Sequence, residues 1–295
     1  MKDISLLIEG GGMRGFFSSG VLQCFLDNDI KIPYVIGISS GSLNALGYVT
    51  DNLGSFFASA RSQGAGYFRL KNLKHLDRGI LDTDRFFGPA AAGYERLIAS
   101  EVIMKVAATR ARDARLVYWE KSGFRSPEDM VTKLRASAAI PVLMPKTIVD
   151  REVFADGGII DSIPVKEAER DGKSRHVVIV TRPLGYRKQK QGMELFLNRW
   201  LEPYPKLKEA ILTRHIRYNQ TLEQLERMER AGSAVIIRPV VNRLGRTEFN
   251  MKKFRRIYED GYEIASHNLD RIRVLLDQDR AILKDVASTQ LVREG

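Results

Sequence analysis

The first fifty residues hold two strand–turn–helix units in succession, each with a glycine-rich turn. The apolar run ISLLI (4–8) leads into 10-GGGMRG, and an apolar segment at helical spacing follows over 16–28. The run YVIGI (34–38) leads into 37-GISSG, after which small and apolar residues again follow a helical pattern. Strands that alternate with helices in this way predict an α/β fold with a mainly parallel sheet covered on both faces.

The rest of the chain continues this alternation. A mostly helical stretch contains a strand at LVYWE (116–120), and the later segment KLRASAAIP is a predicted helix stopped by Pro141. Further strands are predicted at TIV and VFA, which form a hairpin ending at Asp156, and at HVVIVTRP (176–183) and AVIIRPV (234–240). Helices are predicted over about 188–231 and from Thr247 to about Val286.

No break in composition marks a domain boundary, so we expect one domain over 1–295. Its motif-bearing core covers about 4–183, and about 184–295 supplies the last strand and a helical C-terminal part. The region of about 184–233 matches no known pattern, and it is expected to form part of a binding wall or a surface cover.

Composition limits the setting in which the chain works. The single cysteine, Cys24, excludes an internal disulfide framework and a cysteine-based metal cluster, and it favours a reducing compartment. The apolar run at the start is interrupted by Glu9, so a signal peptide is not expected. No stretch approaches the roughly 18 to 20 apolar residues that cross a bilayer. We therefore expect a soluble, cytoplasmic protein that can touch a membrane from the side.

Basic residues exceed acidic ones, with 47 Lys and Arg against 36 Asp and Glu and a net charge of +11. Much of the excess lies in the clusters 185-GYRKQKQG and 252-KKFRR. Such clusters fit contact with an anionic membrane or with nucleic acid, and they also fit a plain solvated surface. Zinc-finger spacing and single-stranded-RNA motifs are absent, so nucleic acid is not expected as a partner.

The segment 37-GISSG has the G-x-S-x-G pattern of a nucleophile elbow. In that arrangement a serine lies on a strained turn between a strand and a helix, and flanking glycines, here Gly37 and Gly41, allow close approach. Ser39 is therefore the candidate nucleophile. The alternative is a tight turn in which Ser39 or Ser40 only caps the following helix.

The segment 10-GGGMRG allows two interpretations. Consecutive glycines let backbone N–H groups point into one cavity, where they can stabilise the oxyanion of a tetrahedral intermediate. Gly11, Gly12 and Arg14 would then be the donors, with Gly10 and Gly15 as supporting glycines. The same letters satisfy the dinucleotide fingerprint G-x-G-x-x-G, but that function needs an acidic residue at the end of the second strand, where this chain has GISSG.

A serine nucleophile needs a base, because its hydroxyl is a poor nucleophile until the proton is removed. None of the four histidines (His75, His176, His215 and His267) stands in a recognisable catalytic loop. Asp156 is the better candidate, since it follows a short strand and Gly157 and Gly158 keep its surroundings open. An aspartate is a weak base at neutral pH, so the site would have to desolvate it. An Asp-Gly turn without chemistry is the alternative.

Together, 10-GGGMRG, 37-GISSG and 156-DGG resemble the patatin-like phospholipase family, which has an oxyanion loop, a nucleophile elbow and a D-G-A/G motif in this order. The segment 137-SAAIP is also similar to the S-x-A-x-P stretch of that family, and the resemblance covers about residues 4–183. It implies a three-layer α/β/α sandwich and a Ser-Asp dyad in which Ser39 attacks the acyl carbonyl and Asp156 accepts its proton.

The implied activity is hydrolysis of lipid acyl esters, of phospholipase A or lysophospholipase type, through an acyl-enzyme and without a metal or other cofactor. The substrate would be a phospholipid or another acyl ester. Two alternatives stay open: a non-catalytic lipid-binding or scaffold protein on the same fold, and a nucleotide-binding protein that uses the glycine-rich loop. Retention of both Ser39 and Asp156 argues against the first of these.

Overall fold

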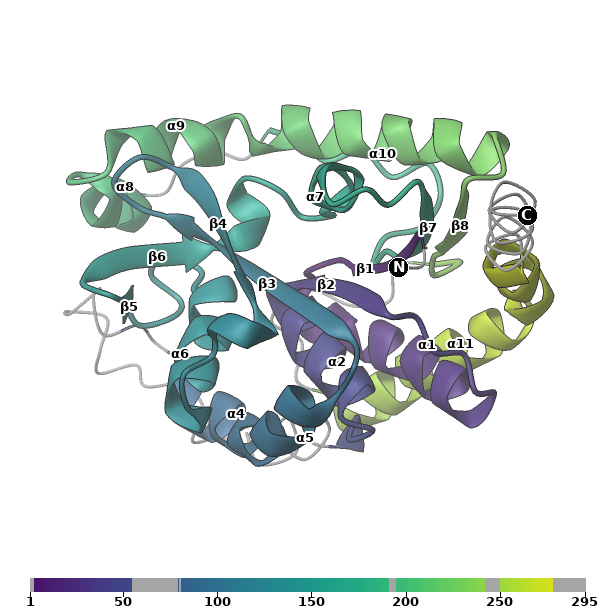
Figure 1. The fold of residues 1–295 in the computed structure, drawn as a ribbon. Coiled ribbons are helices and arrows are strands. Elements are labelled where there is room, and N and C mark those ends of the chain that lie inside the picture. Colours follow the sequence, from purple (N-terminus) through teal and green to yellow (C-terminus); the bar gives the residue numbers. More distant parts are fainter. Residues whose placement is uncertain (1–2, 55–78, 80, 191–194, 242–249, 278–295) are drawn as a thin grey trace, which may run out of the picture.

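The protein is built around an eight-stranded sheet (Figure 1). The computed structural model describes residues 3–54, 79, 81–190, 195–241 and 250–277 of the 295-residue chain. The strands run in the order β5-β6-β3-β2-β1-β7-β8, and β4 also pairs with β3. They are β1 (Ile4–Ile8), β2 (Tyr34–Ile38), β3 (Ile103–Arg110), β4 (Arg115–Glu120), β5 (Thr147–Val149), β6 (Glu152–Asp156), β7 (Arg175–Ile179) and β8 (Ala234–Ile237).

The centre of the sheet is parallel and one end is antiparallel. Strands β3, β2, β1, β7 and β8 pair in parallel, whereas β4 and β6 pair antiparallel with β3, and β5 antiparallel with β6. Every residue of β1, β2 and β7 is buried, as expected for parallel strands covered on both faces. The carboxyl ends of these strands meet at one edge, which is where α/β proteins place their sites.

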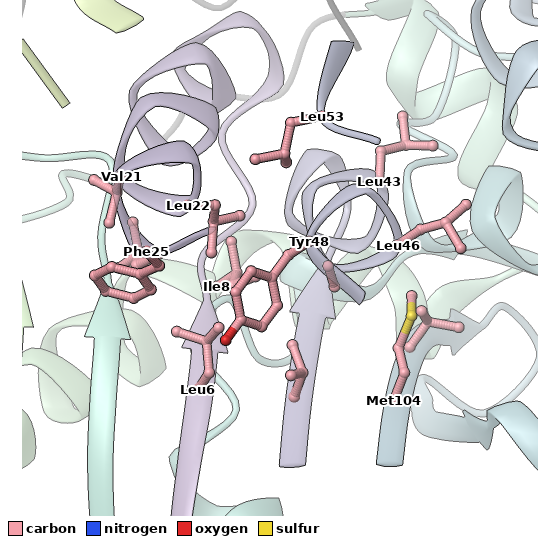
Figure 2. Packing of buried hydrophobic residues seen from close by; sticks show 14 of the residues in the cluster. Leu6, Ile8, Val21, Leu22, Phe25, Leu43, Leu46, Tyr48, Leu53 and Met104 are labelled. Carbon is pink, nitrogen blue, oxygen red and sulfur yellow. The ribbon is translucent and has the colours of Figure 1, made fainter. Parts of the chain in front are cut away.

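Helices cover both faces of the sheet, so the fold is a three-layer α/β/α sandwich. Leu6 and Ile8 of β1 face α1 (Gly15–Asp27) and α2 (Ser40–Val49) in one large apolar cluster (Figure 2). Leu7 lies between them in sequence and joins the cluster on the opposite face, beneath α7 (Val165–Arg170) and α10 (Arg214–Arg230). The other helices are α4 (Thr83–Phe87), α5 (Tyr94–Ala99), α6 (Pro127–Ser137), α8 (Leu195–Leu201), α9 (Pro205–Leu212) and α11 (Met251–Ser266).

Most predicted elements are confirmed, including both N-terminal strand–turn–helix units, the hairpin that ends at Asp156 and the two late parallel strands. Three predictions need correction. The stretch taken as mostly helical contains the central strand β3. Helix α6 ends at Ser137 rather than directly before Pro141, and the C-terminal helix is interrupted after Ser266, with helical residues resuming over 269–277.

Helices α1 and α11 approach each other at backbone contact distance, and Figure 1 shows them side by side. A β-carbon at Gly20 of α1 would overlap the carbonyl of Tyr258, and one at Gly261 of α11 would overlap the carbonyl of Phe17. Next to this crossing, the ring of Phe254 stacks on that of Phe16 with centroids 4.5 Å apart. The C-terminal part of the chain is therefore packed directly on the helix that follows the first glycine-rich turn.

His176 lies near the amino end of β7, at the opposite edge of the sheet from the carboxyl ends. It is fully buried, and its Nδ1 is 2.8 Å from the hydroxyl of Ser5. Burial lowers the pKa of His176 to about 4, with a small opposing effect from the charge of Asp3. The imidazole is therefore neutral in the folded protein at neutral pH.

This burial predicts acid sensitivity. The folded-state pKa lies below the ordinary value of about 6.5, so the contribution of His176 to stability is complete above pH 6.5 and falls as the pH drops towards about 4. Between pH 7 and pH 5 we expect this group alone to lower the free energy of unfolding by about 2 kcal/mol. Urea unfolding of wild type and of His176→Asn at both pH values measures the difference, and an equal loss in both proteins would contradict the assignment.

Candidate active site

Ser39 lies on the strained turn between β2 and α2. Its backbone has φ 56° and ψ −125°, a conformation that residues other than glycine rarely adopt. The turn is tight because Gly37 and Gly41 allow it: a β-carbon at Gly37 would overlap the carbonyl of Gly41, and one at Gly41 would overlap the carbonyl of Ile8. The side chain of Ser39 does not cap α2, so the interpretation of this serine as a simple helix cap is wrong.

The strained turn directs the Ser39 hydroxyl at Asp156. Its Oγ donates to Asp156 Oδ2 at 2.7 Å, and both residues are only 6% exposed. Asp156 is the last residue of β6, where it pairs with Ala108 of β3. Its second oxygen, Oδ1, accepts from the backbone N–H of Gly158 at 2.7 Å. The two residues predicted from the sequence are thus hydrogen-bonded to each other, although they lie 117 positions apart in the chain.

The segment 137–139 at the end of α6 holds both residues of this pair. The hydroxyl of Ser137 accepts from the backbone N–H of Ser39 at 2.9 Å, and the carbonyl of Ala139 accepts from the backbone N–H of Asp156 at 2.9 Å. Ser137 is fully buried. The serine of 137-SAAIP, noted in the sequence without a role, therefore fixes the elbow.

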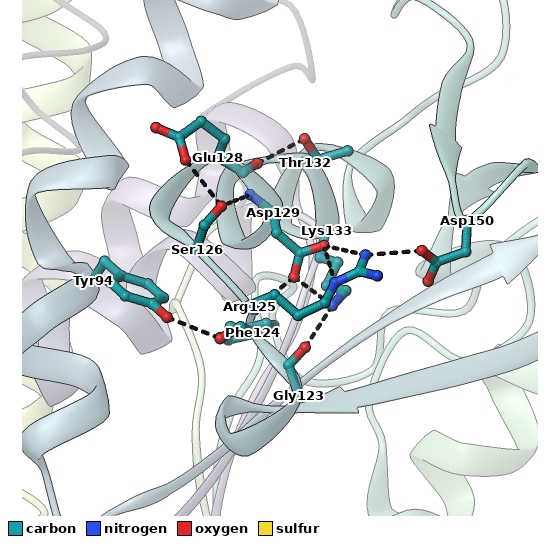
Figure 3. Close-up of polar contacts among 10 residues, drawn as sticks. All are labelled: Tyr94, Gly123, Phe124, Arg125, Ser126, Glu128, Asp129, Thr132, Lys133 and Asp150. Atoms are coloured by element: carbon teal, nitrogen blue, oxygen red, sulfur yellow. Dashed lines mark hydrogen bonds and ion pairs between the residues drawn. The ribbon is translucent and has the colours of Figure 1, made fainter.

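The other end of α6 is anchored by a polar cluster (Figure 3). Ser126 caps the helix by accepting from the backbone N–H of Asp129, and Asp129 accepts from Arg125 and from Lys133, each at 2.7 Å. Burial alone would raise the pKa of Asp129, but the hydrogen bonds from Arg125 and Lys133 outweigh it and lower that pKa to about 2. Arg125 also donates to Asp150 at 2.8 Å, in the turn between β5 and β6. The helix that holds Ser39 is thus tied to the hairpin that presents Asp156.

Removing the Ser137 hydroxyl should disturb the elbow without removing a reacting group. The backbone N–H of Ser39 would be left buried without its acceptor, which costs about 1–3 kcal/mol and loosens the strained turn. For Ser137→Ala we expect turnover to fall by about tenfold or more, with little change in KM, and Ser137→Thr should restore part of it. Steady-state kinetics on a p-nitrophenyl ester, with thermal unfolding as a control, tests this; a change confined to stability would show that Ser137 has only a structural role.

The glycine-rich loop 10-GGGMRG lies against the same pocket. The structure brings Gly11, Gly12 and Arg14 together there, but the backbone N–H of Gly11 already donates to the hydroxyl of Ser40 at 3.0 Å. Gly12 has φ +57°, which the absence of a side chain permits. The backbone N–H of Arg14 donates to the carbonyl of Gly11 at 3.3 Å. Gly12 is thus better placed than Gly11 as a backbone donor to an oxyanion, and the assignment of Gly11, Gly12 and Arg14 to this role stays a prediction.

A buried network that the sequence did not reveal holds Arg14. Its Nε donates to Thr181 Oγ1 at 3.4 Å, and Thr181 donates through its hydroxyl (3.0 Å) and its backbone N–H (2.5 Å) to Glu9 Oε2. Tyr218 of α10 donates to Glu9 Oε1 at 2.7 Å. Burial, and then the charge of Glu9, raises the pKa of Tyr218 well above its usual range, so the hydroxyl keeps its proton and remains a donor. No local motif marks these residues, because they meet only through the fold.

The Ser39–Asp156 pair lies in a pocket with two unlike walls. Most of the apolar residues that line it lie just before α4, in α4, or in the segment after α6: Leu81, Phe86, Phe87, Ile140, Leu143 and Met144. Met13 and Ile159 line it as well. The cations that line it are Arg14, Arg182, Lys188 and Arg214. Three of these follow residue 180, so the region that matched no pattern in the sequence contributes to the pocket.

The histidines within the described residues take no part in the Ser39–Asp156 pair. His176 lies at the far edge of the sheet, Nδ1 of His215 is 3.1 Å from the carbonyl of Leu212, and His267 ends α11. His75 lies outside the described residues. In the described part of the chain, no three His, Cys, Asp or Glu side chains gather in a way that could hold a metal ion.

The arrangement defines an α/β protein with a buried serine–aspartate pair beneath a partly apolar pocket. A sequence profile described as patatin-like phospholipase matches residues 6–169. The chain therefore belongs to the patatin-like phospholipase family. A second profile, a domain of unknown function (DUF6363), matches residues 204–277.

The chain is also similar to individual proteins. Lysophospholipase nte1 of Aspergillus oryzae is 24% identical over 296 residues, which cover 92% of this chain and 18% of that protein. The uncharacterised protein YjjU of Escherichia coli is 30% identical over 195 residues, covering 61% of this chain and 52% of its own length. The chain is also similar to the crystal structure of VipD from Legionella pneumophila, with a TM-score of 0.48 and 12% identity. The matched region covers 95% of this chain and 67% of the VipD chain. The chain spans about a fifth of the length of the curated lysophospholipases it matches.

Proposed function

We propose that this protein is a lipid acyl-ester hydrolase of phospholipase A or lysophospholipase type, with Ser39 as nucleophile and Asp156 as base. The observation that carries the proposal is the 2.7 Å hydrogen bond from Ser39 Oγ to Asp156 Oδ2, made from a strained turn at the pocket floor. Membership of the phospholipase family and similarity to lysophospholipases support a lipid ester as substrate.

The first half of the reaction forms an acyl-enzyme. Asp156 accepts the proton as Ser39 Oγ attacks the acyl carbonyl, and the oxyanion forms beside Gly12 and Arg14. The C–O bond to the alcohol then breaks, and the alcohol leaves with the proton from Asp156.

The second half releases the fatty acid. Asp156 takes a proton from water, the hydroxide attacks the acyl-enzyme, and the Ser39–acyl bond breaks with return of the proton to Ser39. The second oxygen of Asp156 stays bonded to the N–H of Gly158, which keeps the carboxylate oriented through both halves.

A fluorophosphonate probe tests the proposal and separates it from a lipid-binding protein without activity. We expect the wild type to release free fatty acid from a panel of p-nitrophenyl esters and lysophospholipids, and to carry the probe on Ser39 in a peptide mass map. A folded protein that binds lysophospholipid but neither hydrolyses esters nor reacts with the probe would support the non-catalytic alternative.

Contact with an anionic membrane is a further part of the proposal, and the structure favours one of the two basic clusters for it. Arg187 is paired with Glu226 at 3.0 Å and Lys188 is buried, so the described part of the first cluster, 185–190, is not a simple surface patch. In the second cluster, Lys252, Lys253, Arg255 and Arg256 are exposed on α11. None of the described helices is long and apolar enough to cross a bilayer.

We expect weak, salt-sensitive binding to anionic vesicles through α11. Each basic residue near such a surface contributes about 1 kcal/mol, so Arg255→Gln with Arg256→Gln should weaken binding by about tenfold or more. The exposed pair Lys31→Gln with Lys206→Gln serves as the charge-matched control. Sedimentation with neutral and anionic vesicles at low and high salt measures this, and equal binding to both lipids would rule out the proposed electrostatic contact.

A further inference from the structure

Three of the four cations that line the pocket come from outside the segment that matches the phospholipase family. Arg182 and Lys188 follow β7, and Arg214 begins α10, whereas the family match ends at residue 169. Arg214 falls within the 204–277 segment of unknown function. This segment therefore supplies part of the pocket in which Ser39 lies.

The pocket has more positive than negative charge. Its described lining contains four cations, Arg14, Arg182, Lys188 and Arg214, against two carboxylates, Glu9 and Asp156, an excess of two positive charges. Glu9 already accepts hydrogen bonds from Tyr218 and Thr181, and Asp156 from Ser39 and Gly158. An anion that entered the pocket would therefore meet this excess of positive charge, and burial would strengthen the attraction.

Two of the cations are held in place by tyrosine rings. Nζ of Lys188 lies 4.2 Å from the ring centre of Tyr218, and the guanidinium of Arg182 lies 4.6 Å from that of Tyr186. The two rings pack edge to face with centroids 6.1 Å apart. Lys188 is 9% exposed, and an ammonium group so far from water is stable mainly where aromatic faces or anions surround it.

Arg214 brings the positive charge next to the reacting pair. Its Nη2 donates to Ser162 Oγ at 3.1 Å. A β-carbon at Gly158 would lie 2.9 Å from this Nη2 and 3.0 Å from Asp156 Oδ1, so the two groups flank the same glycine. The second glycine of 156-DGG thus leaves room for an arginine beside the base.

The two walls belong to opposite faces of the sheet, and this orients an ester. Phe86, Phe87 and Met144 belong to the apolar cluster beneath α1 and α2, whereas Tyr218, which supports Lys188, belongs to the cluster beneath α10. In Figure 1, α4 and α10 correspondingly lie on opposite sides of the sheet. With the carbonyl at Ser39, an acyl chain fits against the apolar wall and the alcohol portion then extends towards the cations.

Building on the proposed function, we propose that Arg182, Lys188 and Arg214 form a subsite for a phosphate group carried by the leaving alcohol. Guanidinium and ammonium groups are the donors that bind phosphate oxygens best, and arginine can do so with two parallel hydrogen bonds. The enzyme would then prefer acyl esters with a phosphate head group over neutral esters of the same chain length. The role of the segment after β7 is to select the head group.

The test compares lysophosphatidic acid with the monoacylglycerol of the same acyl chain, both below their critical micelle concentrations. We expect the wild type to favour the phosphate ester in kcat/KM by at least a hundredfold. Arg182→Gln, Lys188→Gln and Arg214→Gln should each lower that ratio by about tenfold or more, mainly through KM, because a charge-assisted hydrogen bond is lost. Arg227→Gln, an exposed cation of α10 away from the pocket, should leave the ratio unchanged. A wild-type ratio near one, or three variants with the wild-type ratio, would overturn the subsite.

Binding to Ser39→Ala separates this inference from the catalytic proposal. Titration calorimetry should show that lysophosphatidic acid binds more tightly than the monoacylglycerol, and that the Lys188→Gln change reduces this difference by about tenfold or more. If the wild type hydrolyses neither lipid but this difference persists, the proposed function fails and the subsite stands. Inorganic phosphate that binds as tightly as lysophosphatidic acid would indicate a free-phosphate site and overturn the head-group assignment.

Discussion

Ser39→Ala is expected to lower turnover on acyl esters by about 10⁴-fold or more while leaving the protein folded. Serine hydrolases that lose the nucleophile retain only the acceleration due to binding and oxyanion stabilisation. The substitution removes one hydroxyl and its hydrogen bond from a 6% exposed position, so the protein should remain folded. Turnover on a p-nitrophenyl ester and thermal unfolding of both proteins provide the two measurements.

Ser40→Ala is the informative companion of this variant. Ser40 is adjacent and buried, but its hydroxyl accepts from the N–H of Gly11, whereas the hydroxyl of Ser39 donates to the carboxylate of Asp156. Fluorophosphonate labelling should therefore vanish in Ser39→Ala and persist in Ser40→Ala. The reverse pattern would assign the nucleophile to Ser40.

Asp156→Asn should reduce turnover almost as severely, by about 10³-fold or more. The substitution keeps the size of the side chain, and its carbonyl oxygen can still accept from the N–H of Gly158. The amide nitrogen would then face Ser39 Oγ, where it can donate a hydrogen bond but cannot take the proton. Single-turnover kinetics on the p-nitrophenyl ester and the rate of fluorophosphonate labelling should fall together.

Histidine variants provide the control for the Asp156→Asn prediction. His215→Ala and His267→Ala change residues away from the pair and should keep substantial activity. A histidine variant that is folded, as shown by circular dichroism, and inactive would instead indicate a Ser-His-Asp triad. In that case Asp156 would orient a histidine and would not act as the base.

The sequence predicts those parts of the fold whose signals are local. Continuous apolar runs predict β1, β2, β7 and β8, and glycine-rich turns predict where chain direction reverses. The sequence pattern does not predict strand β3, because Lys105 and three small residues interrupt its run of large apolar residues. The fold accommodates Lys105 through ion pairs with Glu167 and Asp171, two acids from α7 and its end, and their approach cannot be inferred from the sequence around residue 105.

The same distinction separates the predicted and the unpredicted parts of the site. Ser39 and Asp156 each lie in a short motif of neighbouring residues, 37-GISSG and 156-DGG, that forms a single turn. Both residues can therefore be found from the sequence. The network from Arg14 through Thr181 to Glu9 and the cations at 182, 188 and 214 depends on contacts between distant segments. No residue pattern along the chain encodes such contacts, so only the structure reveals them.

The backbone contact at Gly20 and Gly261 restricts where this protein can adapt to ligands of different shape. Helix α1 begins directly after Arg14 and packs closely against α11. We therefore expect the glycine-rich loop, which forms one side of the pocket, to move little when a ligand binds. Among the described residues, the wall formed by α4 and residues 140–144 consists of separate short pieces, and we expect closure around a bound chain to come from this wall. Tolerance for acyl length is thus a property of that wall, and engineering for longer or shorter chains should begin there.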